Sequence, residues 1–185
     1  MSGPGVANGS GQYYQDTING NVFIGTTAAA GVVLAAYNAT AVTFALWNPA
    51  GNSRNAVLIG CDIGYISGTV ASSTYTYSYQ TGVGSTAATA APITAATLGT
   101  PVNGLIGSGQ SSSMRFVPAT LTLTTGGTLL KTIGAANIGV AATTTNVVRD
   151  NINGTIIVPP GSIFIVGTIG TSGITAAISL VWEEI

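Results

Sequence analysis

The chain has 185 residues, of which 46% are hydrophobic and only 5% are charged, with a net charge of −1 at pH 7. This length suits a single domain that buries roughly 70% of its unfolded surface, and soluble domains usually carry about 25% charged residues. The composition therefore indicates a neutral surface that packs against other chains, and four isolated basic residues argue against nucleic-acid binding.

The first twenty residues are predicted to form an N-terminal arm, followed by one domain over residues 21–185. The first eleven residues, MSGPGVANGSG, offer almost nothing apolar to bury and predict a flexible chain. A neighbouring subunit could accept the apolar side chains of Tyr13, Tyr14 and Ile18, so we expect the arm to order on binding. Residues 28–36 could form a helix or a strand, and the glycine and paired valines in this segment favour a strand.

The strongest strand pattern runs from Val57 to Ser67, after a shorter strand at Ala41 to Trp47. One face of the long strand is predicted to be fully apolar, with Val57, Ile59, Cys61, Ile63 and Tyr65. The opposite face contains Gly60, Asp62 and Gly64, so either something packs closely there or the strand bulges. Cys61 is the only cysteine and is expected to be a buried, unreactive thiol. A hairpin is the economical connection between these strands, although residues 48–55 could also pass between two sheets.

Three tyrosines, Tyr75, Tyr77 and Tyr79, alternate along the next predicted strand. Such a ladder favours cross-strand packing on a half-exposed sheet. The alternative is a platform that stacks sugars or a partner protein. The candidate interface residues come from the arm, the glycine-rich face of the long strand and this tyrosine ladder: Tyr13, Tyr14, Ile18, Gly60, Asp62, Gly64, Tyr75, Tyr77 and Tyr79.

The second half of the chain predicts further strands separated by turns. Residues 82–110 form a long loop with a short strand at Ile93 to Leu98, and its other apolar anchors are Val102, Leu105 and Ile106. Residues 119–133 predict a hairpin that turns at Gly126-Gly127. Shorter strands are predicted at residues 114–117, 146–149, 155–158 and 163–166, with Asn-Gly turn chemistry at Asn153-Gly154 and a long final strand at residues 174–182.

Eight to ten strands without a convincing helix predict an all-β fold. The expected architecture is a two-sheet β-sandwich of the jelly-roll type. We find no fixed repeat of the kind that a solenoid would require.

No combination of residues predicts catalysis. The chain has no histidine, which excludes histidine-activated nucleophiles and the commonest metal ligand. Asp62 is the one acid on a predicted strand, and a structural, hydrogen-bonded role explains it best. We therefore expect no enzyme activity, no metal and no cofactor.

The chain also lacks the apolar run of about eighteen residues that spans a bilayer and the basic start of a secretory signal. We expect no membrane partner, and an intracellular product or part of a particle assembled inside a cell.

Three stretches carry a likeness to a known class of proteins: Leu46-Trp47-Asn48-Pro49, residues 64–69 (GYISGT) and residues 179–184 (SLVWEE). With the Thr/Gly/Ala-rich composition, the chain resembles small β-sandwich virion proteins of tailed bacteriophages, in particular capsid cement or decoration proteins. The stretches cover less than a fifth of the chain. The resemblance implies a structural protein, made in the host cytoplasm, that sits on the outer capsid surface and bridges neighbouring major capsid subunits.

Such proteins are often trimers, and the charge-poor surface also favours a homotrimer. The alternative function is a receptor- or glycan-binding head or fibre protein of a phage that uses the face of Tyr75, Tyr77 and Tyr79.

Overall fold

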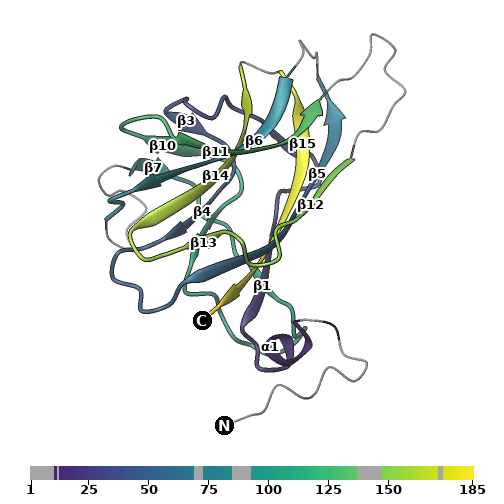
Figure 1. Cartoon of the computed structure of the whole chain (residues 1–185), viewed down its shortest axis with the longest axis vertical. Helices are drawn as coiled ribbons and strands as arrows, with labels where there is room; N and C mark the ends of the chain where they lie inside the picture. Colours follow the sequence, from purple (N-terminus) through teal and green to yellow (C-terminus); the bar gives the residue numbers. More distant parts are fainter. Residues whose placement is uncertain (1–10, 12, 69–72, 85–92, 137–146, 171–172) are drawn as a thin grey trace.

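The computed structural model describes residues 11, 13–68, 73–84, 93–136, 147–170 and 173–185. Over these residues the fold is all-β, as expected, with fifteen strands in three antiparallel sheets and one short helix, α1 (Tyr14–Ile18) (Figure 1). The first ten residues of the predicted arm lie outside this part of the chain.

The largest sheet has seven strands and is built on the pairing of β5 with β15. Its order is β12-β5-β15-β1-β8, with β13 also beside β5 and β2 also beside β15. The strands are β12 (Val147–Asn151), β5 (Ala56–Ser67), β15 (Thr175–Glu184), β1 (Val22–Thr26), β8 (Val102–Asn103), β13 (Ile157–Val158) and β2 (Val32–Val33).

A five-stranded sheet faces the first sheet, and a three-stranded sheet covers its other side. The five-stranded sheet has the order β11 (Thr128–Ala136), β6 (Ser73–Thr81), β14 (Ser162–Ile169), β4 (Ala45–Asn48) and β9 (Arg115–Val117). The small sheet has the order β3 (Ala41–Val42), β10 (Leu121–Leu123) and β7 (Ile93–Ala96).

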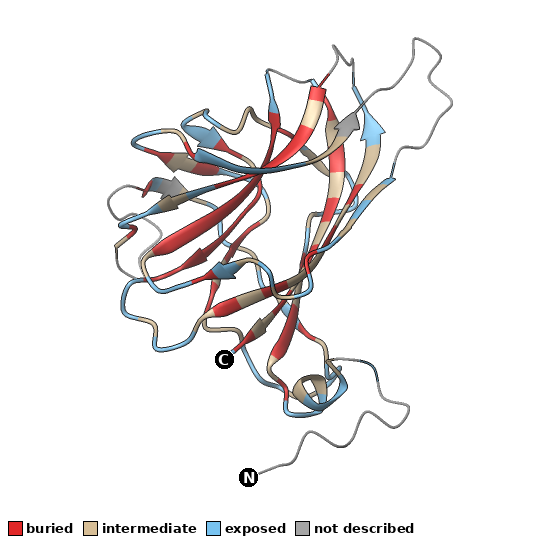
Figure 2. Cartoon of the chain, viewed as in Figure 1, coloured by how far each residue is buried: buried red, intermediate tan, exposed pale blue. Residues whose placement is uncertain are grey.

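Two apolar cores result, one on each face of the five-stranded sheet. Between the two large sheets, the Trp182 ring lies 6.2 Å from the rings of both Phe23 and Phe116, and Phe44 meets Phe116 edge-on at 5.3 Å. On the other face, Trp47, Ile163 and Ile165 pack with apolar residues of the small sheet. Figure 2 accordingly shows β14 buried along nearly its whole length.

The predicted strand at residues 57–67 is confirmed, but its single apolar face is wrong. Leu58 pairs with Trp182 and Gly60 with Val181, so Ile59 is the extra residue of a β-bulge. The bulge changes which side chains point inward: Leu58 is buried before it, Cys61 and Ile63 after it. Val57 and Ile59 are consequently only partly buried.

The glycines of β5 do not accommodate a close neighbour, which corrects that part of the prediction. A Cβ atom on Gly60 would come no closer than 3.5 Å to another residue, the carbonyl oxygen of Asp150, and one on Gly64 would lie 3.9 Å from the oxygen of Ala177. Both are ordinary contacts. The predicted alternative, a bulge, is what occurs beside Gly60.

Both predicted hairpins are wrong, because each connects strands of different sheets. For residues 48–55 the predicted alternative, a passage between two sheets, is what occurs. The segment from Ala41 to Trp47 breaks into β3 and β4, and residues 49–55 then cross from the five-stranded to the seven-stranded sheet. Likewise β10 belongs to the small sheet and β11 to the five-stranded one. Gly126 is required there for space, since a Cβ atom would collide with the backbone carbonyl of Asn38.

The more local predictions are confirmed. Asn153 and Gly154 have positive φ angles of 50° and 77° and form the expected Asn-Gly turn. The final strand alternates as predicted, with its even-numbered residues from Ala176 to Glu184 buried. Residues 28–36 contain the short strand β2 and no helix.

Alanine substitutions at two strand glycines distinguish tight from open sites. At Gly25 a Cβ atom would lie 2.6 Å from the ring of Phe116, which Phe44 and Trp182 hold in place. We expect Gly25→Ala to lower the free energy of unfolding by about 1–3 kcal/mol through overpacking. Gly64→Ala should leave it unchanged or raise it by less than about 1 kcal/mol. Urea unfolding measures both, and equal effects at the two positions would contradict the packing described above.

Candidate interaction surface

The tyrosine ladder of β6 lies mostly inside the protein. Tyr75 and Tyr77 are completely buried in the core between the large sheets, and the Tyr77 ring lies 4.8 Å from that of Phe164. Only Tyr79 is accessible, with 38% of its surface exposed. Cross-strand packing therefore explains Tyr75 and Tyr77, and a surface platform made of all three tyrosines is wrong. The reason is that the seven-stranded sheet covers this face of β6.

Asp62 lies on a solvent-exposed part of β5 and forms an ion pair with Arg149 of β12. The Arg149 Nε atom is 3.0 Å from the Asp62 carboxylate, and both side chains are largely exposed. Exposed pairs of this kind contribute little, typically about 0.2–1 kcal/mol. Asp62 thus has a partner on the neighbouring strand, and neither it nor the adjacent glycines line either of the two cavities described below.

Several apolar side chains are exposed at the end of the molecule that carries α1 (Figure 1). Two segments contribute exposed side chains there, α1 and the stretch from β8 to residue 106. We call this surface the α1 end and define it by Tyr14 (54% exposed), Ile18 (46%), Val102 (60%), Leu105 (39%) and Ile106 (90%). Contiguous exposed apolar side chains are typical of interaction sites.

Asn103 holds the two segments of the α1 end together. Its buried amide nitrogen donates to the carbonyl oxygen of Gly20 at 2.6 Å, and its amide oxygen accepts from the backbone N–H of Leu105 at 2.8 Å. The Gly104 N–H donates to the carbonyl of Val22 at 2.8 Å. These contacts fix residues 103–105 against the turn that follows α1, so the apolar side chains of Leu105 and Ile106 face outward.

The α1 end includes two of the three residues that were predicted as apolar anchors of the arm. Tyr14 and Ile18 are exposed and accessible to a partner, as expected of the arm, whereas Tyr13 is partly buried. The prediction that Val102, Leu105 and Ile106 anchor the long loop is wrong, because their side chains are exposed. Among the apolar residues predicted to anchor this loop, Ile93 is the one that is buried. The Asn103-Gly104 pair was the available signal, because it is a turn sequence that can direct the following residues outward.

Two carboxyl groups meet beside the α1 end. Partial burial raises the pKa of Glu183 in β15, and the nearby Asp16 carboxyl of α1, which shares a hydrogen bond with it, raises it further. The backbone brings them together, since Asn21 N–H donates to the Asp16 carbonyl and Glu184 N–H donates to the Asn21 carbonyl, both at 2.9 Å. Ionisation of Glu183 beside Asp16 therefore weakens the attachment of α1 to β15.

Glu184 is a buried carboxylate that the sequence analysis missed. It is 2% exposed and accepts four hydrogen bonds: from Ser112 Oγ, from Ser113 N (3.0 Å), from Ser113 Oγ (2.6 Å) and from Trp182 Nε1 (3.2 Å). These bonds join residues 112–113 to β15. The alternation of the final strand was a usable signal, because position 184 falls on the same inward face as Leu180 and Trp182.

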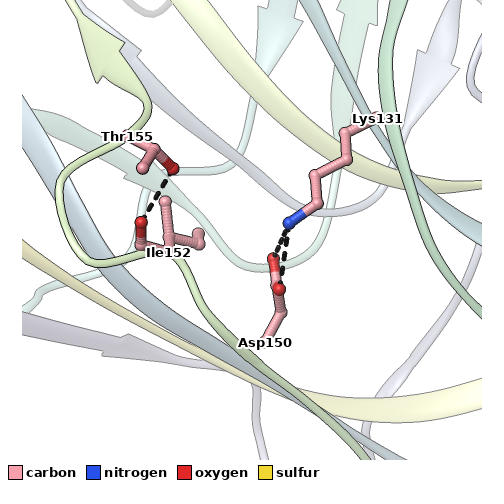
Figure 3. A network of polar contacts seen from close by, with 4 residues as sticks. All are labelled: Lys131, Asp150, Ile152 and Thr155. Atoms are coloured by element: carbon pink, nitrogen blue, oxygen red, sulfur yellow. Dashed lines mark hydrogen bonds and ion pairs between the residues drawn. The ribbon is translucent and has the colours of Figure 1, made fainter.

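An ion pair joins the edge strands of the two large sheets. Lys131 of β11 donates to both carboxylate oxygens of Asp150 of β12, each at 3.0 Å, close to the turn in which Thr155 bonds to Ile152 (Figure 3).

Cys61 of β5 is a buried thiol, and burial raises its pKa to about 12. The predicted burial of Cys61 is confirmed, and the raised pKa keeps the thiol protonated at neutral pH.

Two of the surface cavities are lined by described residues. The larger, about 340 Å³, lies between β13 and the edge of the five-stranded sheet, and its lining is mostly apolar, including Tyr79, Leu130 and Ile157. The smaller, about 210 Å³, is lined by parts of residues 98–101 and 111–115.

In the described part of the chain, no group of three or more His, Cys, Asp or Glu residues is placed to hold a metal ion. No helix among these residues could cross a membrane.

Glu184→Gln should destabilise the protein by about 1–3 kcal/mol. One carboxylate oxygen faces the Trp182 N–H and the other faces the Ser113 N–H. In either orientation of the glutamine side chain, its NH₂ group would therefore face one of these N–H groups, so that a donor faces a donor. Urea unfolding at neutral pH tests this, and a stability equal to that of the wild type would show that the four bonds are not needed.

Glu183→Gln should behave in the opposite way. Because the pKa of Glu183 is raised in the folded protein, its ionisation costs stability as the pH rises from the ordinary value of 4.5 through the raised value. The uncharged glutamine avoids this cost. We expect the variant to melt higher than the wild type at pH 7 and to lose that advantage below the ordinary pKa. A lower melting temperature at pH 7 would contradict the carboxyl pairing.

Comparison with known proteins adds no relative: no protein-family model matches the chain, and no similar protein was found among curated proteins or solved structures.

Proposed function

We propose that this protein is a non-enzymatic structural protein of a virion, a cement or decoration protein that oligomerises on the outer surface of a bacteriophage capsid and bridges major capsid subunits. The observation that carries the proposal is the α1 end, where five large apolar side chains are exposed together. A soluble protein that acts alone rarely exposes such a surface, whereas an assembly protein buries it against a neighbour.

The charge distribution supports the same proposal. The chain has nine ionisable acidic and basic side chains in total, four basic and five acidic. Two ion pairs in the described region use four of these nine. A surface with so few charges loses little hydration when a partner covers it, and interface cores are generally depleted in charge. Two apolar cores meanwhile give the domain a rigid scaffold on which the α1 end is presented.

The N-terminal arm leads directly into the α1 end, which supports its proposed role in attachment. Tyr14 and Ile18 belong to both the predicted arm and the exposed surface. We therefore assign the α1 end to contacts between chains in a homotrimer, with the arm extending these contacts to the shell. The jelly-roll-like arrangement of the strands belongs to this proposal and stays a prediction.

The alternative, a glycan-binding head, has less support. It relied on the face of Tyr75, Tyr77 and Tyr79, and two of these three rings are buried. The cavity beside Tyr79 has hydroxyl groups but no amide, carboxylate or basic side chain in its lining. No observation favours it as a second candidate function.

Ile106→Asp tests the role of the α1 end. Ile106 is 90% exposed, so the substitution should change the free energy of unfolding by less than about 0.5 kcal/mol. It places a charge in the proposed interface, where burial would be costly. In sedimentation at micromolar concentration we expect a trimer for the wild type and a monomer for the variant. Val147→Asp is the matched control, because Val147 is 59% exposed on β12, outside the α1 end, and should remain trimeric.

A stable wild-type monomer would contradict the trimer. A trimer that persists in Ile106→Asp would show that the α1 end is not its interface.

A further inference from the structure

Arg115 is a partly buried cation that has no hydrogen-bond or ion-pair partner among the described residues. It begins β9, the edge strand of the five-stranded sheet. Its Nε atom is buried and makes no hydrogen bond. Over the described residues the ion pairs are Lys131 with Asp150 and Arg149 with Asp62, and neither includes Arg115. Buried donors normally have acceptors, and leaving one unpaired costs more for a charged group than for a neutral one.

A cavity lies next to this unpaired group. It has a volume of about 210 Å³ and is lined by Arg115, Ser111, Ser112 and Thr100, with Leu98 and Pro101 as apolar walls. A water molecule occupies about 30 Å³ in the liquid, so a carboxylate-bearing side chain fits the space. The cavity therefore combines a cation, hydroxyl groups and room for a ligand.

Among the residues that the structure describes, none provides the missing acceptor. Glu184 is the carboxylate nearest in the hydrogen-bond network, because it accepts from Ser112, which lines the cavity. Its two oxygens already accept from two serine hydroxyls, a backbone N–H and an indole N–H. Glu184 is thus satisfied by neutral donors, and Arg115 stays unpaired beside it.

Donors also exceed acceptors on the neighbouring strand. Trp47 of β4 is paired with Arg115 across the sheet, so the two side chains lie on the same face. The indole N–H of Trp47 is buried and likewise has no acceptor. Trp47 is completely buried and lies outside the cavity lining, so of these two groups only Arg115 is placed to meet an acceptor supplied from outside the chain.

We propose that the cavity at Arg115 binds a carboxylate group. The planar guanidinium presents paired N–H donors that match the two oxygens of a carboxylate, and the hydroxyls of Ser111 and Thr100, which also line the cavity, add donors. The carboxylate comes from an Asp or Glu side chain of a partner protein or from a small free acid. This inference does not depend on the proposed capsid function.

Titration of the isotope-labelled protein by NMR tests the proposal. The probe is sodium acetate at constant ionic strength, and the signals are the side-chain Nε–H of Arg115 and the backbone N–H groups of Ser111 and Ser112. We expect saturable shifts with acetate and none with chloride. Arg115→Gln should weaken binding at least about tenfold, whereas Arg54→Gln, at an arginine outside the cavity lining, should bind like the wild type. If Arg115→Gln does not fold, Arg115→Lys keeps the charge, lacks the planar fork and should also bind more weakly.

Two further titrations identify the source of the carboxylate. A capped peptide Gly-Asp-Gly that binds more tightly than acetate, while its Asn counterpart does not bind, indicates an acidic side chain of a partner. Binding of acetate but not of the peptide indicates a small acid. Shifts that do not saturate, equal shifts in Arg115→Gln, or sulfate binding as tight as acetate would overturn the carboxylate site.

Discussion

Burial of β14 on both faces is the constraint on which the rest of the structure depends. Phe164 and Val166 point into the core of the large sheets, while Ile163 and Ile165 point to the opposite side. A strand buried on both sides needs two covering layers, because each exposed isoleucine would lose about 1.5–3 kcal/mol of burial energy. The seven-stranded sheet provides one layer and the three-stranded sheet provides the other.

This constraint explains which parts of the fold could be predicted. The alternation of β15 and the turn at Asn153-Gly154 depend on neighbours in the sequence, so the pattern identified both. The third sheet could not be predicted in this way. Val42 and Phe44 are two residues apart and look like one face of one strand, yet they lie in different cores because the chain turns between them. The bulge at Ile59 is also set by its partner strand β15, which no local pattern reveals.

The candidate surface was partly predictable for the same reason. The exposed positions of Tyr14 and Ile18 were anticipated from the polar sequence around them. The sequence predicted Ile106 to be a buried anchor. Its side chain is exposed because Asn103 bonds to Gly20, more than eighty residues away, and a local pattern does not reveal that bond. Arg115 and Glu184 show the same limit: a single charge in a sequence does not reveal whether donors and acceptors around it will balance. Within the part of the chain that the structure describes, Glu184 has four donors and Arg115 has no acceptor.

The central claim is that the α1 end is covered by neighbouring chains in an assembled particle. Electron cryomicroscopy of an intact particle that contains this protein tests it most directly. The account predicts copies distributed over the whole shell as trimers, with α1 and residues 102–106 inside the contacts between chains. Copies confined to the tail or to sparse spikes, or an α1 end facing solvent, would contradict it.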